Sequence, residues 1–486
     1  MKVLFVTPPM GNWSTWGKHS STNPSHAQLA AFLRDRGGLE VEALDCKVLE
    51  LNDHEMMEEI RQRAPAAVYF GNVVTTAGGA AIIARFNQSM ERIKRELPEI
   101  ITIAGGLMYS ALPEQSLQEC SAIDYLIVGE GEQTLLELAQ AMKSEKPPLN
   151  DVLSLGFREN GRIVLNPLRP LIGNLDTLPM PAYDLFPMDQ YIGYDNMAHY
   201  NETVTSRGCM GGCNFCYQWW LYDPRRPKDF VSYRTRSGKK VADEVEMLYR
   251  NYGVRVLSFF DDDFSCSREK VEEFCHELIQ RKIDVSWFFM GRADNYVRDA
   301  DLFPLLRQAG CYMVLVGIEG ASDEELKGMG KGITVTQIKE AVNGLRENGI
   351  ATVGTYVIGF WEDNAEKIKQ RAEFVEEVDP VVLSLQVLNP SPGSPVWRDA
   401  QKKGIIEVND LSLWDQHHPV MPTRYLSRKE VGQLAAEINM RFFTAPSRIE
   451  RVKSGYYSHY ANLLTQCYFN NAASFAAASA EDQVFV

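Results

Sequence analysis

The segment "RGCMGGCNFCYQWW", residues 207–220, places three of the nine cysteines of the chain within eight positions. The spacing of Cys209, Cys213 and Cys216 is C-x3-C-x2-C, and no fourth Cys or His stands close by in the sequence. A structural zinc site normally has four protein ligands, and a thioredoxin-type pair of Cys213 and Cys216 would leave Cys209 unused. A [4Fe-4S] cluster with three thiolate ligands and one open iron uses all three. The spacing therefore favours the cluster over zinc, a redox pair or a coincidental loop.

Hydrophobic strand patterns alternate with amphipathic helical patterns around and after this segment. In "REKVEEFCHELIQRKI", apolar residues recur at the spacing of one helix face and include Cys275, for which a core role is expected. Cys266 precedes it in the same unit. The repeated pattern predicts six βα units and an open, partial barrel. The strand patterns are "NETVTSRGC", "VRVLSFFDDD", "DVSWFFMGR", "YMVLVGIEG", "ATVGTYVIGF" and "VVLSLQVLNP".

The first 145 residues show the same alternation with different strand sequences. Such alternation predicts an α/β fold with a doubly wound, Rossmann-like parallel sheet. Ligands of open α/β sheets bind beyond the carboxyl ends of the strands, so the loops that follow the strands are the candidate ligand loops. These loops are "TPPMGNWSTWG", "GNVVTTAGG", "GGLMYSALPEQ" and "GEGEQT".

Four segments follow from these patterns. Residues 1–145 form the first α/β domain, and residues 146–195, rich in Pro and Asn, form a linker packed between domains. Residues 196–400 form the partial barrel, and residues 401–486 form a helical C-terminal domain that could act as a lid. The small-residue tail "NNAASFAAASAEDQVFV" is expected to be poorly ordered.

Composition and charge narrow the function. The net charge is −14 and no basic block occurs, which argues against nucleic acid as a partner and favours a small molecule. The apolar run at the N-terminus is too short for a signal peptide or a membrane span. Scattered cysteines, odd in number, do not resemble a secreted disulfide framework. We therefore expect a cytoplasmic protein without a membrane span.

The C-x3-C-x2-C segment, placed after the first strand of a predicted partial barrel, resembles the signature of the radical S-adenosylmethionine (SAM) enzymes. The resemblance covers residues 195–400. It implies that Cys209, Cys213 and Cys216 bind a [4Fe-4S] cluster whose open iron chelates SAM, and that one electron cleaves SAM to methionine and a 5'-deoxyadenosyl radical.

The resemblance also implies a set of SAM-binding residues. Phe215 matches an apolar position near adenine, and Asp261 and Asp262 match the acidic end of strand two, which faces the ammonium group of SAM. Solvated helix-capping carboxylates are the alternative for these two aspartates. Arg292 and Glu319 resemble positions that hold the methionine carboxylate and the ribose. Mutual pairing of Arg292 and Glu319 is the alternative for this pair, because a buried Glu requires a ligand or an Arg partner.

The order of the domains resembles the cobalamin-binding subfamily of radical SAM enzymes. The resemblance implies that cobalamin lies over the strand ends of the first domain, with its nucleotide tail near "GNVVTTAGG" and "GGLMYS". A cobalamin-like domain without cofactor is the alternative, and NAD binding is disfavoured because no G-x-G-x-x-G follows strand one. The implied cobalamin-binding residues are Thr7, Pro8, Trp13, Thr75, Thr76, Gly105, Gly106, Gly129 and Glu130.

The axial histidine motif D-x-H-x-x-G of cobalamin mutases is absent after strand one. We therefore expect base-off cobalamin without an axial His from this loop, with its lower face left to water or shielded by Met10, Trp13 or Trp16. His19 is an outside candidate for the axial ligand.

The resemblance implies a C-methyltransferase that transfers a methyl group from methylcobalamin to a substrate carbon radical. An alternative is a cyclase, oxidase or rearrangement enzyme, because "CNFCYQWW", "YRTRS" and "MRFF" also resemble the anaerobic magnesium-protoporphyrin monomethyl ester cyclase. A sensor of cobalamin or iron–sulfur clusters is the non-enzymatic alternative. The expected partners are a small-molecule substrate and a one-electron reductase, flavodoxin or ferredoxin.

Aromatic and histidine clusters complete the set of candidates. Tyr217, Trp219, Trp220 and Tyr222 could line a wall for a large, flat or apolar substrate, with core packing as the alternative. The adjacent His417 and His418 are expected to be solvated on a polar loop rather than to bind a metal or tetrapyrrole. Residues 456–460, which include three tyrosines and a histidine, could form part of a lid.

Overall fold

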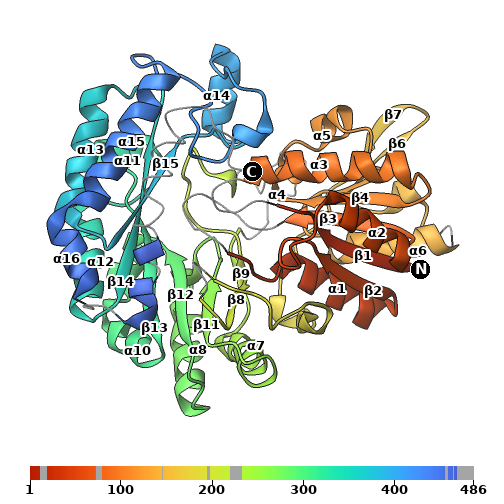
Figure 1. The fold of residues 1–486 in the computed structure, drawn as a ribbon, viewed down its shortest axis with the longest axis horizontal. Coiled ribbons are helices and arrows are strands. Elements are labelled where there is room, and N and C mark those ends of the chain that lie inside the picture. Colours follow the sequence, from red (N-terminus) through yellow and green to blue (C-terminus); the bar gives the residue numbers. More distant parts are fainter. Residues whose placement is uncertain are drawn as a thin grey trace.

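The computed structural model describes residues 1–10, 19–72, 79–144, 146–193, 197–218, 232–454, 458–463 and 465–467. Two largely parallel sheets lie side by side with their covering helices, the first built from the N-terminal part of the chain and the second from its middle (Figure 1). The predicted α/β architecture, a doubly wound sheet followed by a partial barrel and C-terminal helices, is confirmed.

The first sheet has seven strands in the order β2-β1-β3-β4-β5-β6-β7. β1 to β5 run parallel and β6 and β7 antiparallel. The strand order changes direction at β1 and β3, which is the crevice where open α/β sheets bind ligands. The strands are β1 (Lys2–Thr7), β2 (Glu40–Asp45), β3 (Ala67–Asn72), β4 (Ile101–Gly106), β5 (Tyr125–Ile127), β6 (Leu155–Glu159) and β7 (Arg162–Leu165).

Six helices belong to this sheet, and local sequence signals fix their ends. Asn52 caps α2 and shares a capping box with Glu55, while Gly38 ends α1 in the left-handed conformation with φ of 58°. The helices are α1 (Pro24–Gly37), α2 (Asp53–Arg63), α3 (Gly79–Glu96), α4 (Leu107–Ala111), α5 (Pro113–Glu119) and α6 (Glu132–Ser144).

The hairpin β6–β7 corrects the expectation of a linker over residues 146–195. Its turn is Asn160–Gly161, and both residues have positive φ, 51° and 77°. An Asn-Gly pair between two short apolar runs is a strong hairpin signal, which the Pro- and Asn-rich surroundings had obscured. The first sheet therefore extends to Leu165, and residues 166–193 continue along the boundary between the two sheets.

The second sheet has six parallel strands in the order β15-β14-β13-β12-β11-β8. This is the predicted set of six βα units in an open barrel. A short antiparallel pair, β9 (Ser206–Arg207) with β10 (Arg234–Thr235), leads into the cysteine segment. The strands are β8 (Tyr200–Thr203), β11 (Val256–Phe259), β12 (Ser286–Gly291), β13 (Cys311–Gly317), β14 (Ala351–Ile358) and β15 (Val382–Val387).

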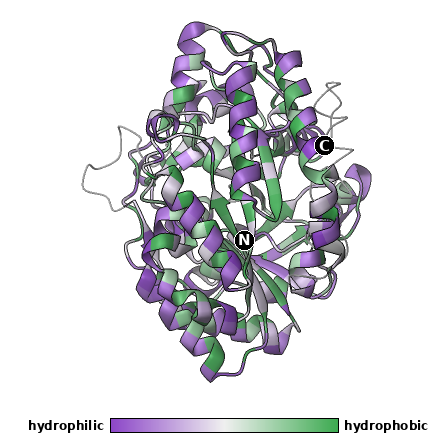
Figure 2. Ribbon diagram, turned by 90° about the vertical axis from the view of Figure 1, so that its left-hand side faces the viewer, coloured by the Kyte–Doolittle hydropathy of each residue, from purple (hydrophilic) through white to green (hydrophobic). Residues whose placement is uncertain are grey.

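The helices of this sheet bury the faces that the sequence predicts. In α8, Val271, Phe274, Cys275 and Leu278 are buried, so Cys275 has the expected core role. The helices are α7 (Gly238–Asn251), α8 (Arg268–Gln280), α9 (Ala293–Arg298), α10 (Phe303–Gln308), α11 (Asp323–Gly328), α12 (Val335–Glu347) and α13 (Ala365–Val378). Hydrophobic residues lie mainly on the strands and hydrophilic ones on the helices around them (Figure 2).

The C-terminal region contains α14 (Pro395–Lys403), α15 (Arg428–Thr444) and α16 (Pro446–Lys453). The segment between α14 and α15 reaches the first domain, because the 3-10 turn Leu411–Leu413 packs on α3, and Trp414 and Val420 pack with Met108 of α4. The predicted disordered tail lies outside the described residues. Among the described helices, none is both long and apolar enough to cross a membrane.

Candidate cofactor site

The three cysteines lie in the loop that follows β9, at the carboxyl end of the second sheet. All three are partly buried, and burial raises the pKa of Cys209 to about 12 and that of Cys216 well above its usual value. Cys213 and Cys209 lie close enough to Cys216 to raise its pKa further, whereas the Gly211 amide donates to Cys209 Sγ at 3.2 Å. The thiols of Cys209 and Cys216 ionise readily only beside added positive charge, which a bound metal supplies.

The arrangement of these thiols bears on the zinc alternative. Within the described residues, no three Cys, His, Asp or Glu side chains are placed to share a single metal ion. A tetrahedral zinc site requires convergence on one ion, whereas each thiolate of a [4Fe-4S] cluster binds a different iron. The preference for the cluster therefore comes from the ligand count, with three cysteines and no fourth Cys or His close by in the sequence.

Asp261 and Asp262 support the backbone ahead of the cysteines. Asp261 is fully buried and accepts hydrogen bonds from the amides of Thr205, at 2.9 Å, and Ser206. Asp262 accepts from the Gly208 amide at 2.9 Å and from the Tyr217 hydroxyl. The alternative of solvated helix caps is wrong for Asp261. Both carboxylates hold the residues that lead to Cys209, and their contact with the ammonium group of SAM stays a prediction.

The third aspartate of the same run was not singled out from the sequence. Burial raises the pKa of Asp263 to about 6, and its carboxylate accepts from Ser265 Oγ at 2.9 Å and Asn295 Nδ2 at 2.8 Å. It lies near Cys209, whose pKa it raises. A run of three acids gives no sign of which one faces the cysteines, because this depends on how the chain turns after β11.

Arg292 and Glu319 both reach the cysteine loop but do not pair with each other. Arg292 binds Asp294 at 3.0 Å and the Lys331 carbonyl at 2.8 Å. A Cβ on Gly211 would lie 2.7 Å from Arg292 Nη1, so glycine here admits the guanidinium beside the loop. The expected alternative, an Arg292–Glu319 ion pair, is wrong.

Glu319 is paired with Lys331, a residue that sequence reasoning missed. Lys331 Nζ lies 3.1 Å from Glu319 Oε1, to which Thr355 Oγ1 also donates at 2.7 Å. Glu319 Oε2 is buried and has no hydrogen-bond partner within the described part of the chain. Lys331 lies near Cys213, and both Glu319 and Cys213 raise its pKa against the opposing effect of burial. A cation and an unsatisfied carboxylate oxygen therefore stand beside the loop, as a zwitterionic ligand would require.

The Phe215 side chain packs near β14 and β15, at one edge of the second sheet. Its ring packs edge-on against Phe360 with centroids 5.6 Å apart, in a small apolar cluster with Val357, Leu388 and Met421. Tyr217, the first residue of the predicted aromatic wall, donates its hydroxyl to Asp262 instead of lining a free surface. Trp219, Trp220 and Tyr222 lie outside the described residues.

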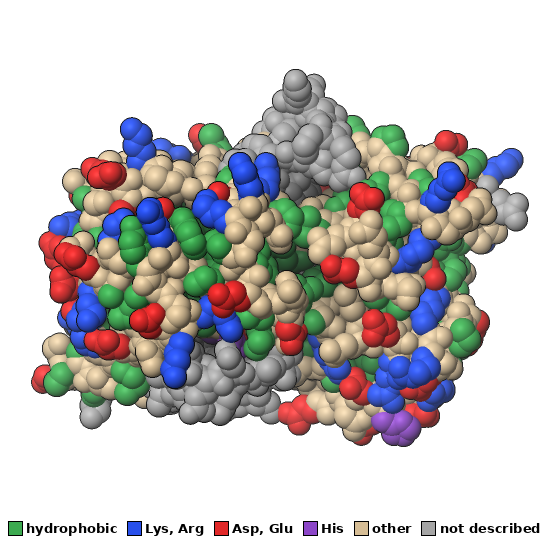
Figure 3. Space-filling model, turned by 90° about the horizontal axis from the view of Figure 1, so that it is seen from above, with side chains coloured by type: hydrophobic (Ala, Val, Ile, Leu, Met, Phe, Trp, Pro, Cys, Tyr) green, Lys and Arg blue, Asp and Glu red, His purple; other side chains and the backbone are tan. Residues whose placement is uncertain are grey.

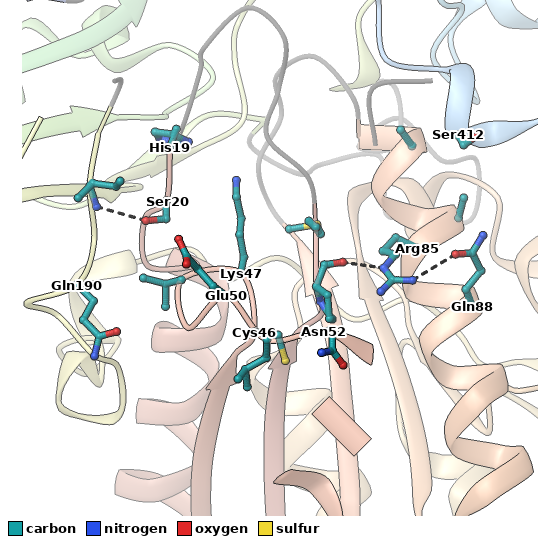
Figure 4. Close-up of a pocket in the computed structure, with 17 residues that line it drawn as sticks. His19, Ser20, Cys46, Lys47, Glu50, Asn52, Arg85, Gln88, Gln190 and Ser412 are labelled. Carbon is teal, nitrogen blue, oxygen red and sulfur yellow. Dashed lines mark hydrogen bonds between the residues drawn. The ribbon is translucent and has the colours of Figure 1, made fainter. Parts of the chain in front are cut away.

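A polar cavity of about 690 Å³ opens beyond the carboxyl ends of β1 and β2. Figure 4 shows Lys47 extending into it, with Ser20 on one side and Arg85 of α3 on the other. Arg85 of α3 closes one side by donating to the Pro9 carbonyl at 2.7 Å and by pairing with Asp53. The cavity lies at the change of strand direction, where a ligand of this sheet is expected.

Of the cobalamin-binding residues predicted around β1 and β3, Thr7 and Pro8 directly precede Pro9, which lines this cavity, and the others lie outside the described residues. Thr7 ends β1, and its buried Oγ1 has no hydrogen-bond partner among the residues described here. Pro8 follows and is buried. Trp13, Thr75 and Thr76 fall in the ranges that the structure does not describe. The orphaned Thr7 hydroxyl and the polar cavity fit a ligand rich in amides, such as cobalamin.

The glycines predicted on β4 and β5 divide into two groups. A Cβ at Gly105 would meet the Tyr69 hydroxyl, so the space there admits the Tyr69 ring rather than a ligand. Gly106 and Gly129, with φ of 108° and 88°, line a second cavity of about 120 Å³. Thr203, Ser206, Gly208 and Asp262 line the opposite wall, so this cavity lies between the two sheets beside the cysteine loop.

Glu130 lines the second cavity and also joins the two domains through its ion pairs. Its carboxylate lies 2.7 Å from Arg234 Nη1 and 3.1 Å from Arg207 Nη1, and it accepts from the Ile172 amide at 2.6 Å. Burial alone would raise the pKa of Glu130, but the two arginines hold it below its usual value. Both arginines and the Ile172 amide thus occupy this carboxylate, and the cobalamin contact expected at Glu130 stays a prediction.

The histidines near the site are buried or already paired with other groups of the protein. His19 lines the polar cavity, but its Nε2 lies 2.7 Å from buried Glu202, so this nitrogen is engaged with protein. His417 and His418 were expected to be solvated and are in fact buried. The loop that carries these histidines folds back on β15. His418 Nδ1 lies 2.8 Å from Asp415, whose carboxylate also accepts hydrogen bonds from the backbone amides of His417 and His418.

Comparison with known proteins assigns both domains. The model of the B12 binding domain matches residues 21–139, and the model of the radical SAM superfamily matches residues 203–375. The chain combines a B12 binding domain with a radical SAM domain. The radical SAM domain implies a [4Fe-4S] cluster and SAM, and the B12 binding domain implies cobalamin.

Relatives match both domains together. An uncharacterised methyltransferase of Pyrococcus horikoshii is 27% identical over 448 residues, 92% of this chain and 93% of that protein. The anaerobic magnesium-protoporphyrin IX monomethyl ester cyclase of Rubrivivax gelatinosus is 28% identical over 456 residues, 91% of this chain and 77% of that protein. The structure of the radical SAM methyltransferase TsrM from Kitasatospora setae, with cobalamin and a [4Fe-4S] cluster bound, has a TM-score of 0.69 at 16% identity, with 98% of this chain and 99% of that chain covered.

Proposed function

We propose that this protein is a cobalamin-dependent radical SAM methyltransferase that adds a methyl group to a carbon atom of a small molecule. The observation that supports this most directly is the position of the cysteine loop. It stands at the carboxyl end of the radical SAM sheet, and Gly208 lines a cavity whose other wall is the B12 binding domain. Two cofactors held by the two sheets would therefore face one shared space.

The chain supplies binding groups for each cofactor. Cys209, Cys213 and Cys216 would hold the cluster, while Arg292, Lys331 and Glu319 offer complementary charges for the amino and carboxylate groups of SAM. Thr7, Lys47 and Arg85 would contact the amides and the phosphate of cobalamin at the polar cavity. When bound, the cluster supplies one electron for cleavage of SAM, and cobalamin supplies a transferable methyl group.

Partners and compartment follow from the same chemistry. The cluster requires a one-electron donor such as a flavodoxin, a ferredoxin or a reductase. All nine cysteines lie in the described residues and none forms a disulfide, which supports a reducing compartment such as the cytoplasm. Basic and acidic side chains are interspersed on the face seen in Figure 3, which favours a small-molecule substrate over nucleic acid.

The alternative is ring closure or oxidation without methyl transfer. The cyclase from Rubrivivax gelatinosus is as similar in sequence as the methyltransferase relative. The two reactions differ in their use of SAM. Methylation forms S-adenosylhomocysteine alongside 5'-deoxyadenosine, whereas oxidative cyclisation does not require S-adenosylhomocysteine.

The test uses anaerobically reconstituted protein loaded with hydroxocobalamin and reduced with dithionite in the presence of SAM. We expect bound corrinoid absorption and formation of both 5'-deoxyadenosine and S-adenosylhomocysteine. Cys213→Ala should abolish 5'-deoxyadenosine, whereas Cys120→Ala, a buried cysteine of the first sheet, should not. Formation of 5'-deoxyadenosine alone would favour the cyclase, and absence of both products would exclude a radical SAM enzyme.

A further inference from the structure

A buried network of charges joins the two domains directly ahead of the cysteine loop. Glu130 and Glu132 come from the B12 binding domain, and Arg207 and Arg234 from the radical SAM domain. The side chains of Glu130 and Glu132 are only 9% and 3% exposed. Charges buried this deeply persist only when they are paired, so their partners across the boundary are fixed.

Each side of the network is anchored in regular structure. Glu132 is the first residue of α6, and Glu130 is held by the Ile172 amide as well as by both arginines. Arg207 and Arg234 face each other as a register pair of the β9–β10 ladder. Arg207 bridges both carboxylates, 3.1 Å from Glu130 and in contact with Glu132. A shift of either domain would therefore break several charged contacts together.

Few covalent bonds of the backbone separate this network from the first cysteine. Arg207 is separated from Cys209 by Gly208 alone, and the Gly208 amide is itself held by Asp262. Ser206, on the other side of Arg207, is held by the buried Asp261. The segment therefore has little freedom to absorb a change at Arg207 before it reaches the first cysteine.

A second tie joins the domains at the loop that follows β1. His19, from the loop after β1, lies 2.7 Å from Glu202 of β8, to which the Tyr200 hydroxyl donates at 2.9 Å. In the same segment, the Ser20 amide donates to the Ile192 carbonyl at 2.8 Å. Two ligand loops of the B12 binding domain, those after β1 and β5, are thus each tied to a strand that leads to the cysteines.

Stability alone does not account for such a network. A buried ion pair is often no more stabilising than apolar residues of the same size, because desolvation offsets the Coulomb attraction. What charged and bidentate contacts add is a single relative orientation. A need for fixed geometry between the domains would explain why Glu130, Glu132 and Arg234 are buried as charged side chains.

We propose that Arg207, Glu130 and Glu132 are positioning residues. Together they fix the separation between the cobalamin and the [4Fe-4S] cluster. The inference rests on the proposed function, because it assumes that both cofactors bind. It assigns to the sequence "GEGE" a role in orienting the domains rather than in contacting cobalamin.

The test compares Glu132→Gln with Glu137→Gln. Both residues lie on α6, but Glu137 pairs with Arg169 within the first domain. In protein loaded with cob(II)alamin and a reduced cluster, pulsed electron paramagnetic resonance measures the magnetic coupling between the two centres. We expect Glu132→Gln to broaden or weaken this coupling and Glu137→Gln to leave it as in the wild type. S-adenosylhomocysteine formation should fall roughly 10- to 100-fold in Glu132→Gln.

A second measurement needs no cofactor. Hydrogen exchange of the cofactor-free protein should increase over residues 203–210 in Glu132→Gln but not in Glu137→Gln. If Glu132→Gln does not fold, Arg207→Lys replaces it, because lysine keeps the charge but cannot bridge two carboxylates as a fork. Wild-type coupling and wild-type exchange in the folded variant would overturn the inference. Absence of bound corrinoid in the wild type would instead refute the proposed function, and the exchange experiment would still report on the network.

Discussion

The positions of individual charged side chains locate the candidate SAM site more precisely than the cysteine motif does. The thiols of Cys209 and Cys216 have raised pKa values because they are buried. Arg292 is the cation near Cys209 and Cys213, and Lys331 is the cation near Cys213. Glu319 keeps one carboxylate oxygen without a hydrogen-bond partner within the described residues. Such a group is costly to bury, so its persistence supports a role in ligand binding.

Replacement of Lys331 by Met should destabilise the protein by about 3–5 kcal/mol, because it leaves the Glu319 carboxylate buried without its counter-charge. The free energy of unfolding in urea measures this. Lys327→Met, at an exposed position of α11 just before this loop, is the control and should have little effect. The double variant Lys331→Met/Glu319→Gln should lose less than Lys331→Met alone. An equal or larger loss in the double variant would show that the ion pair does not explain the effect.

The buried His26 side chain should make the free energy of unfolding depend on pH. The residue is fully buried between Phe5 and Tyr69, and desolvation lowers its pKa to about 3 from 6.5. A group with a depressed folded-state pKa contributes stability above its unfolded pKa and loses it as the pH falls. Between pH 7 and pH 5 the wild type should lose about 2 kcal/mol through this residue.

His26→Leu removes this titration, so urea unfolding at pH 7 and pH 5 should show a smaller loss for the variant by that amount. The account of His26 fails if both proteins lose the same stability over this interval.

At the scale of elements, the cysteine loop is supported by a neighbour far away in sequence. The loop after α11 packs against it, since the Asn214 amide donates to the Met329 carbonyl at 2.9 Å. Gly330 has φ of 68°, and a Cβ on it would lie 2.5 Å from the Gly212 carbonyl oxygen. Glycine is thus required here both for its conformation and for the close approach of the two loops.

Gly330→Ala should displace the cysteine loop and reduce the iron bound per chain after reconstitution. Gly404→Ala is a matched control, because Gly404 has φ of 64° but nothing within 4 Å of its added Cβ. Both variants pay the cost of a left-handed alanine, about 1 kcal/mol. Only Gly330→Ala should lose iron, and equal iron contents would contradict the role given to this contact.

The elements were predictable from sequence to the extent that their signals are local. Alternating apolar runs and amphipathic helices indicated both sheets, and the spacing of the cysteines indicated the cluster. The hairpin β6–β7 was missed although Asn160–Gly161 marks it, because its strands are short and lie among prolines. Lys331 and the partners of Glu130 could not be found, since these contacts join residues that only the folded chain brings together.

At the scale of the whole molecule, the chain places two cofactor domains in one fixed relation. The B12 binding domain offers a polar cavity at its strand ends, and the radical SAM domain presents its cysteine loop at the boundary. The C-terminal segment contacts both, through Trp414 on the first domain and Met421 beside Phe215 on the second. This arrangement suits a reaction in which two cofactors act on one enclosed substrate.

The central claim is that one iron of the cluster has no protein thiolate and is therefore open to SAM. The cysteine that most directly challenges this is Cys266, which is partly buried and close to the Met210 amide of the cysteine loop. If Cys266 bound the fourth iron, SAM would have no site on the cluster.

Mössbauer spectroscopy of protein reconstituted with ⁵⁷Fe, with and without SAM, tests this claim directly. We predict that SAM changes the spectrum of one iron site and leaves the others unchanged, and that Cys266→Ala gives the same response. A spectrum that SAM does not alter, or one in which Cys266→Ala exposes an iron site that the wild type lacks, would contradict the account.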